Sequence, residues 1–449
     1  MKSRQVNMLS GSITKGLLAL TLPVMIRDVL QTMLSVIDMA VLGNLVDDDA
    51  VGAVGACGAL IILVTGLLIG IATGANVVVA KHIGRGDKAL AGVAAGSGVA
   101  FSVISGIALM IFGIVFAEPM LEIASCPGEL FSQATVYLRL YFCGVPSLLL
   151  YNFAASALSA CGDTRRPMFY LLSGGVLKIG LNIGFIILFD LTVEGVAYAT
   201  IISNTFVGVL TFVTMFRVKE QMNFGMRNVM PVFSELKKIL FIGVPSGIQR
   251  GLYSVANLVI AATVNKMGPD ATTGLAIANQ YDGILYAIAC AASVAITPYV
   301  AQNIGAGNFA RARESVKKSI IITIVIAGSL GCLSAVFSGQ LSLLMTSSPA
   351  VIGYSRQKMM IISSTYFICG INEIMCGTLR GIGKPIVPTV ATFIYMCVLR
   401  FFWVYCIFPL CPNMTFLYLV WPMGWVLSLI TLTNVYYARI SKMRNEATI

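Results

Sequence analysis

The 449-residue chain is 57% hydrophobic and only 11% charged, whereas a soluble protein carries roughly a quarter charged residues. So few polar residues could not cover a soluble core of this size, which excludes the ordinary soluble classes. The net charge of +11 does not indicate nucleic-acid binding, because the basic residues are gathered in particular loops between apolar blocks. Composition therefore predicts an integral membrane protein.

Twelve apolar segments follow one another along the chain, and each can supply the roughly 20 helical residues that cross a bilayer. They show no alternation of the kind found in membrane β-barrels. We therefore predict an all-α integral membrane protein with twelve transmembrane helices. The predicted spans are 14–43, 50–76, 91–117, 132–160, 168–190, 194–217, 236–265, 272–300, 315–343, 353–379, 386–409 and 415–438.

The loops alternate in charge and thereby predict the orientation. Lys and Arg are concentrated beside both termini and in the loops that follow the even-numbered segments, whereas the other loops are mainly acidic. Because excess Lys and Arg marks the cytoplasmic side, we expect both termini in the cytoplasm of a multi-pass protein of the plasma (inner) membrane. The first residues have no apolar core followed by a cleavage site, so we expect no removable signal peptide.

The sequence repeats itself at a nearly constant spacing. Gly84 and Gly305, in matching Gly-x-Gly turns, stand 221 positions apart (305 − 84), and so do Pro167 and Pro388. We predict an N-lobe at 1–217, a cytoplasmic linker at 218–233 and a C-lobe at 234–449. Each lobe has an even number of crossings, so the two six-helix bundles should be related by a pseudo-two-fold axis along the membrane normal. Substrates of such proteins bind between the repeats.

Four polar residues of the N-lobe lie at similar depths. At about 1.5 Å per helical residue, Asp38, Thr200 and Asn182 lie roughly 8, 9 and 12 Å below the outer face. Lys178 is one turn from Asn182 on the same face of its helix. Ionisable groups inside spanning helices are costly and mark functional sites, so we interpret this group as a candidate ion-coupling and substrate site. A purely structural ion pair between Asp38 and Lys178 is the alternative.

The C-lobe is not an electrostatic copy of the N-lobe, because Glu373 stands where the first repeat has Asn152. Its candidates for substrate binding or coupling are polar residues inside predicted spans, although structural contacts would also explain the arginines. These candidates are Gln249, Arg250, Asn257, Glu373 and Arg400.

Other ionisable residues have simpler interpretations. We expect Arg27 and Asp28 to neutralise each other, Asp282 to meet water near the outer end of its helix, and His82 to be solvated in a basic loop. Pro23 and Pro245 occupy matching positions of the first and seventh spans. Because proline removes a backbone hydrogen bond and bends a helix, both are candidate gating positions, with a static kink as the alternative.

Little in the chain suggests other chemistry. Its eleven Cys form no C-x-x-C pair and are interpreted as small hydrophobic residues. One His and no metal-ligand spacing argue against an enzyme or a metal site. The Gly-x-Gly turns lack the strand and the Lys-Ser/Thr of a P-loop, so we expect no cofactor and an ion gradient as the energy source.

Several motifs, in this order, resemble the multidrug and toxic compound extrusion (MATE) family. They are Leu20-Thr21-Leu22-Pro23, Val36-Ile37-Asp38, Ile83-Gly84-Arg85-Gly86-Asp87, Ala160-Cys161-Gly162-Asp163-Thr164-Arg165-Arg166-Pro167, Gly195-Val196-Ala197-Tyr198-Ala199-Thr200, Ala301-Gln302-Asn303-Ile304-Gly305-Ala306-Gly307 and Leu379-Arg380-Gly381-Ile382-Gly383-Lys384. No single motif is decisive; their order and the two-lobe repeat make the match strong.

The resemblance implies a twelve-helix antiporter that exports organic, often cationic and aromatic, compounds in exchange for H⁺ or Na⁺. The family's Asp on helix 1 and Thr on helix 6 are matched by Asp38 and Thr200, and Glu373 resembles an acid on helix 10. Some members carry an Asn and an Asp one turn apart on helix 5, where this chain has Lys178 and Asn182. A fixed ammonium there would occupy or repel a sodium position.

The leading hypothesis is therefore a secondary antiporter that works by alternating access. Its partners would be small organic molecules, H⁺ or Na⁺ and membrane lipid, but not nucleic acid, and we expect a monomer. The alternative is a flippase for lipid-linked or polysaccharide precursors. Arg27, Arg250 and Arg400 are consistent with this alternative, because it favours a more basic cavity.

Overall fold

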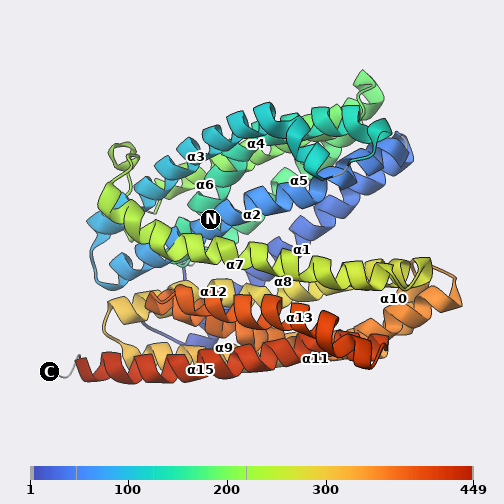
Figure 1. The fold of residues 1–449 in the computed structure, drawn as a ribbon. Helices are drawn as coiled ribbons and strands as arrows, with labels where there is room; N and C mark the ends of the chain where they lie inside the picture. The colour runs from blue at the N-terminus through green and yellow to red at the C-terminus, as the bar shows by residue number, and fades with distance from the viewer. Residues whose placement is uncertain (1–4, 47, 125, 219, 447–449) are drawn as a thin grey trace. The chain divides into compact units, whose positions relative to one another are not determined.

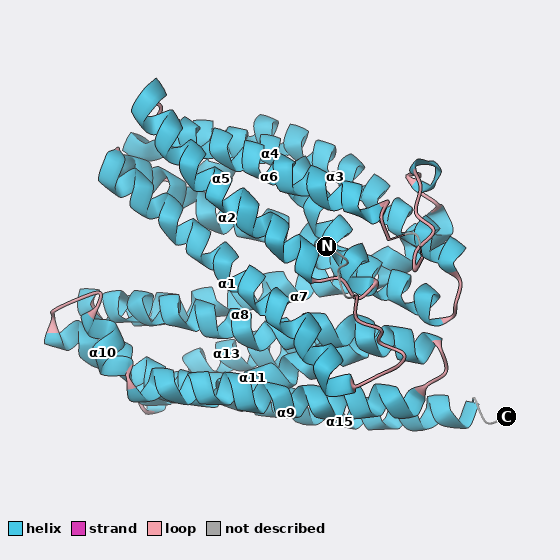
Figure 2. Ribbon diagram, turned by 180° about the vertical axis from the view of Figure 1, so that it is seen from behind, coloured by secondary structure: helices cyan, strands magenta, loops and turns pink. Residues whose placement is uncertain are grey.

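The computed structural model describes residues 5–46, 48–124, 126–218 and 220–446, and these residues form helices and loops without a strand (Figures 1 and 2). Eleven helices of this described part are long and apolar enough to cross a membrane. The remaining long helix, α7 (Phe233–Asn265), is less apolar because it carries Gln249 and Arg250 in its middle. With α7 as the twelfth, the helices follow the predicted order, and the all-α prediction is confirmed.

The chain forms two compact units. Unit 1 contains Leu30–Gly247 together with Gln5 and Val6, and unit 2 contains Asn7–Val29 together with the chain from Ile248 onward. The boundaries of these units differ from those of the predicted lobes, 1–217 and 234–449. The first part of α1 (Ile13–Leu45) belongs to unit 2, and the first part of α7 belongs to unit 1.

In unit 1, α4 is the central helix and packs against α2, α3 and α6, while α5 packs against α6. Small residues and aromatic rings fill the faces of α4, so this helix is largely buried. The helices of this part of the chain are α2 (Asp48–Gly84), α3 (Lys88–Ile123), α4 (Gly128–Ala160), α5 (Arg165–Phe189), α6 (Val193–Met215) and the short 3₁₀ helix η1 (Met226–Asn228).

In unit 2, α11 takes the central place and packs against α8, α9 and α15. The stretch Ile386–Leu410 forms one candidate membrane span, with π-helical turns on both sides of α13. The elements are α8 (Pro269–Gly305), α9 (Phe309–Val336), α10 (Ser338–Leu343), α11 (Pro349–Ile382), α12 (Ile386–Thr392), η2 (Phe393–Val398), α13 (Leu399–Phe402), η3 (Trp403–Ile407), η4 (Phe408–Leu410), α14 (Met414–Tyr418) and α15 (Val420–Glu446).

Helix boundaries reproduce the repeat seen in the sequence. Helix α8 begins and ends 221 positions after α2 (269 − 48 and 305 − 84), and α11 begins 221 after α4 (349 − 128). The turns agree as well. Gly86 and Gly307 have φ values of 79° and 73°, and Asp87 and Asn308 each cap the following helix by accepting a backbone hydrogen bond. Equivalent residues therefore start and stop equivalent helices.

Within unit 1, α2 and the first part of α7 approach each other through glycine pairs. A methyl group at Gly70 would lie 2.3 Å from Cα of Gly247, and one at Gly74 would lie 2.1 Å from the carbonyl oxygen of Ile239. A methyl group at Gly243 would lie 2.6 Å from Cα of Ile71. Both helices thus place a Gly-x-x-x-Gly pair at the contact, the arrangement that lets membrane helices touch backbone to backbone.

The predicted linker runs along α3. The amide of Asn223 donates to the carbonyl oxygen of Lys88, and Ser97 Oγ donates to the carbonyl oxygen of Met230. A methyl group at Gly96 would lie 1.9 Å from the carbonyl oxygen of Asn228. The described part of the linker is therefore fixed to unit 1 by backbone contact.

Candidate functional site

Asp38 on α1 is the centre of a polar cluster in unit 1. Lys178 Nζ donates to Asp38 Oδ2 at 2.5 Å, and Asn182 Nδ2 donates to Asp38 Oδ1 at 2.8 Å. The Lys178 and Asp38 side chains are 14% and 13% exposed. Lys178 and Asn182 reach the same carboxylate because they are one turn apart on α5. The structure thus brings together three of the four predicted N-lobe residues, and we call these three the Asp38 cluster.

Thr200 on α6 is not hydrogen-bonded to the Asp38 cluster. Its hydroxyl donates to the carbonyl oxygen of Val196, in the preceding turn of its own helix, at 2.8 Å. Buried threonines in membrane helices commonly satisfy their donor in this way. The expectation that Thr200 would join the other three side chains is therefore not met at the level of hydrogen bonds.

Two further features of the Asp38 cluster were not anticipated from the sequence. Asn182 is fully buried, and its Oδ1 has no hydrogen-bond partner in the described part of the chain. Tyr137 and Tyr141 on α4 lie within electrostatic range of Asp38. Their spacing of four residues places both phenols on one face of a predicted span, and this signal could have identified them.

The geometry of the Asp38 cluster limits its chemistry. The carboxylate is shared between an ammonium and an amide, so a sodium ion bound to it would lie close to the Lys178 ammonium and be repelled by it. Protonation of Asp38 would remove the negative charge and leave the ammonium without its counter-ion, which is costly in a partly desolvated site. The ion pair with Lys178 therefore disfavours a second cation at the same carboxylate.

In unit 2, Glu373 on α11 is held by neighbours from two helices. Tyr253 Oη donates to Glu373 Oε1 at 2.9 Å, and Arg380 Nη2 lies 3.8 Å from Glu373 Oε2. Gln249 is buried and donates to Cys376 Sγ at 3.5 Å. Arg250, its neighbour in sequence, is exposed. Gln249 thus contacts α11 at Cys376, about one turn from Glu373, whereas Arg250 forms no ion pair with Glu373 among the described residues.

Arg400 is the largest fully buried side chain of the described residues, at 2% exposure. Its Nη1 donates to Asn257 Oδ1 at 2.6 Å, and its guanidinium carbon lies 4.7 Å from the centre of the Trp421 ring. No carboxylate of the described chain forms an ion pair with it, and its Nε has no hydrogen-bond partner there. Helix α13, which carries Arg400, lies between two π-helical turns, a feature often found at functional sites.

A second buried ion pair was missed by the sequence analysis. Lys358 on α11 lies 2.7 Å from Asp282 Oδ2, also bonds to Asn279, and lies 5.9 Å from the centre of the Trp421 ring. The expectation of a wet Asp282 was wrong, because its side chain is only 13% exposed. Helix α11 begins at Pro349, so Lys358 lies deeper in its helix than the predicted span at 353–379 suggested.

His82 also differs from expectation. It is buried, and its Nε2 lies 2.9 Å from Glu235 Oε2. Burial alone would raise the pKa of Glu235, but hydrogen bonds from Lys238 and His82 outweigh burial and lower this pKa below its usual value. The end of α2 is thereby tied to the start of α7, which brings the imidazole out of water.

The remaining sequence candidates lie on α1 and α7. Arg27 Nη2 and Asp28 Oδ1 form the expected ion pair, at 2.7 Å. Pro23 and Pro245 both lie inside continuous helices. The division between the two compact units falls a few residues after each proline. It lies after Val29 in α1 and after Gly247 in α7.

Comparison with known proteins identifies the relatives of this chain. The family model described as MatE matches residues 23–183 and 245–406. The chain is 26% identical over 386 residues to "Probable multidrug resistance protein YoeA" of Bacillus subtilis (strain 168), covering 84% of this chain and 83% of that protein. It is 29% identical over 391 residues to "Probable multidrug resistance protein NorM" of Thermotoga maritima, covering 85% and 83%.

Among solved structures, the chain resembles the crystal structure of MATE in complex with MaL6. The TM-score is 0.91 at 20% identity, and the match covers 99% of this chain and 100% of that one. MATE structures have twelve helices in two bundles. The predicted fold class of twelve membrane-spanning helices in two bundles is therefore confirmed.

Proposed function

Because this chain belongs to the multidrug and toxic compound extrusion (MATE) family of efflux transporters, we propose that it is a secondary active antiporter. It exports organic, often cationic and aromatic, compounds in exchange for H⁺ or Na⁺ by alternating access. The observation that carries this proposal is the Asp38 cluster, in which a carboxylate inside a predicted membrane span is held by one ammonium, from Lys178, and one neutral amide, from Asn182.

The exchange depends on which cation neutralises Asp38. With the carboxylate ionised, Lys178 and Asn182 hold it and link α1 to α5. An entering proton neutralises Asp38, removes its attraction for the ammonium and frees Lys178 to separate from α1. A change of charge is thus converted into a change of contact between two helices, which is the kind of local event that can bias a two-state transporter. The ammonium at this carboxylate favours H⁺ over Na⁺ as the coupling ion.

The test is transport by the purified protein in proteoliposomes, with pH and sodium gradients imposed separately and a fluorescent cationic aromatic dye as substrate. We expect a pH gradient to drive dye movement, and Asp38→Asn to lower the rate at least ten-fold. Glu118→Gln is the matched control, because Glu118 is an acid of the same unit whose side chain is 52% exposed. It should transport at the wild-type rate.

Two results would overturn this assignment. Wild-type transport by correctly inserted Asp38→Asn protein would remove Asp38 from the mechanism. Transport driven by sodium and indifferent to pH would show that the ion pair with Lys178 does not exclude sodium from the carboxylate.

A second candidate concerns the charge of the substrate. Arg400 is buried without a carboxylate partner among the described residues, and burying an unpaired charge costs several kcal/mol, of which a desolvated cation–π contact offsets about 2 kcal/mol. Lys358 also lies beside the Trp421 ring, but Asp282 balances its charge, so Arg400 is the cation at this ring that lacks a carboxylate partner among the described residues. Such a site suits an organic anion with an aromatic body. The same proteoliposomes test it when loaded with an anionic aromatic dye: faster transport of the anion than of the cation favours this second candidate.

The proposal also covers the oligomeric state, the location and the chemistry of the protein. The protein works as a monomer in the plasma membrane with both termini in the cytoplasm, and it uses neither a cofactor nor an enzymatic step. The flippase alternative is not favoured, since the named relatives are described as multidrug resistance proteins.

A further inference from the structure

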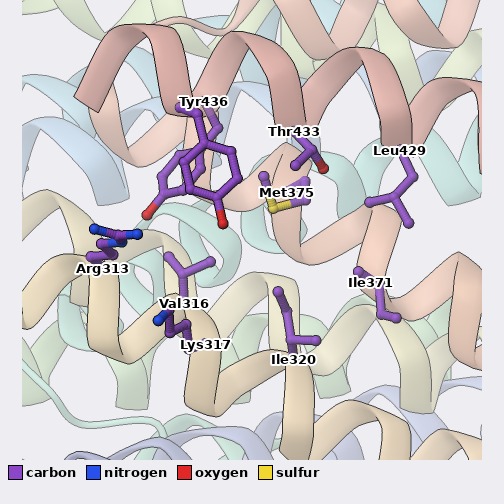
Figure 3. A pocket seen from close by; sticks show the side chains of 10 residues that line it. Arg313, Val316, Lys317, Ile320, Ile371, Met375, Leu429, Thr433 and Tyr436 are labelled. Carbon is purple, nitrogen blue, oxygen red and sulfur yellow. The ribbon is translucent and has the colours of Figure 1, made fainter. Parts of the chain in front are cut away.

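A pocket of about 150 Å³ lies between α9, α11 and α15 of unit 2 (Figure 3). Its lining divides into two ends. Figure 3 shows Arg313, Lys317 and Tyr436 toward one end, and Ile371 and Leu429 at the other. Each helix contributes residues spaced three, four or seven apart, so each presents one face to the pocket. The result is an apolar trough with a cationic end.

The cations of α9 fall into two classes. Arg311 donates to the carbonyl oxygens of Met8 and Ser10, and Lys318 pairs with Glu314 at 2.7 Å. Arg313 and Lys317 line the pocket instead, and neither forms an ion pair with any acid in the described residues.

Arg313 lies beside an aromatic ring, with its guanidinium carbon 5.9 Å from the centre of the Tyr437 ring. Of the helix's basic residues, the two that face the pocket are thus the two that lack an internal acceptor.

A buried hydroxyl adds an independent observation. Tyr436 is 3% exposed, and its Oη has no hydrogen-bond partner within the described chain. A buried hydroxyl that has lost water and gained no hydrogen bond destabilises a protein unless a ligand bonds to it. Arg313, Lys317 and Tyr436 together offer donors for an anion of several oxygens at one end of the trough.

We propose that this pocket binds a membrane phospholipid with an anionic headgroup. The phosphate and headgroup oxygens meet Arg313, Lys317 and the Tyr436 hydroxyl, and the first part of an acyl chain lies along Ile371 and Leu429. Basic pockets between membrane helices bind anionic lipid headgroups by this chemistry. A soluble phosphate compound would use only the cationic end and leave the apolar end empty, so a lipid is the better match.

The test measures lipid binding to the purified full-length protein, independently of transport. Phosphatidylglycerol and phosphatidylcholine with identical acyl chains are titrated in one detergent, and bound lipid is counted by native mass spectrometry. We expect one phosphatidylglycerol to bind at least ten-fold more tightly than phosphatidylcholine. Lys317→Gln should reduce this preference several-fold.

Lys318→Gln is the matched control, because it removes the same charge at the next position of the same helix and should leave the preference unchanged. Tyr436→Phe provides a second variant if Lys317→Gln does not fold, and it should weaken phosphatidylglycerol binding about three-fold. Inorganic phosphate and glycerol 3-phosphate, added at the same concentrations, should not displace the lipid.

Three outcomes would overturn the proposal. Equal affinity for the two lipids would show that the cationic end does not recognise the headgroup. Equal losses in Lys317→Gln and Lys318→Gln would indicate general surface attraction. Displacement by glycerol 3-phosphate would assign the pocket to a soluble anion.

Discussion

The ion pair between Lys178 and Asp38 gives a prediction whose size can be worked out from the structure. Lys178→Met removes the ammonium from a carboxylate that is only 13% exposed. Breaking a buried pair by removing one partner costs about 3–5 kcal/mol. Because Asn182 still donates to Asp38 at 2.8 Å, we expect the lower end of that range, about 3 kcal/mol.

The double variant separates the interaction energy of the ion pair from the other effects of each substitution. When Asp38→Asn is added to Lys178→Met, no uncompensated charge remains, and the site resembles an ion pair replaced by neutral side chains, which is often nearly neutral in stability. We expect the double variant to lie within about 1 kcal/mol of wild type, so the two changes should be non-additive by about 2 kcal/mol or more. Under the proposed mechanism it should nevertheless fail to transport, because position 38 no longer carries a carboxylate.

The assay is the free energy of unfolding in mixed micelles for the wild type, both single variants and the double variant. The exposed pair Glu118–Arg139, at 2.8 Å with side chains 52% and 42% exposed, provides a matched cycle. It should show a coupling below about 1 kcal/mol. Additive effects at Asp38 and Lys178, within about 0.5 kcal/mol, would refute the reasoning.

Two further predictions concern stability. Gly243→Ala should destabilise by about 1–3 kcal/mol, since its methyl group would lie 2.6 Å from α2; Gly283→Ala, with no atom within 4 Å, should be neutral or stabilise by up to about 1 kcal/mol. A loss at both sites in thermal unfolding would contradict the glycine contact. Since hydrogen bonds lower the pKa of Glu235, wild type should be more stable than Glu235→Gln above pH 4.5, the usual value for this carboxyl group. This advantage should fade as the pH falls through the lowered pKa, and an advantage that stays constant from pH 7 down to the pH at which the native carboxyl group is protonated would exclude this origin.

The Asp38 cluster illustrates how much of a membrane site can be predicted from sequence. The depth of a residue in the membrane follows from counting residues along its helix, and the side of the helix on which it lies follows from the helical period. Because ionisable residues are rare in spanning helices, Asp38 and Lys178 had few other partners in their lobe. Thr200 satisfied the same rules, yet its hydroxyl bonds to its own helix. Which acceptor a hydroxyl bonds to depends on the acceptors nearby, including the carbonyl oxygens of its own helix. Depth in the membrane and position on the helix do not decide this choice.

The sequence by itself determined the membrane class, the succession of helices and the internal repeat. Apolar length and glycine-proline turns are local properties, and they recur at a spacing of 221 that the helix boundaries then follow. Burial of individual side chains was decided only by packing. Asp282 and His82 were expected to meet water, but neighbouring helices cover them, and packing also buries Lys358, which the sequence analysis did not single out.

The tertiary structure also decided which cations have partners. Arg311, Arg313, Lys317 and Lys318 are indistinguishable as a basic run, yet two have internal acceptors and two line a pocket. The physical reason is that a helix carries its residues around its axis every 3.6 positions. Neighbours in sequence therefore meet different surroundings, and those surroundings are set by helices far away in the chain.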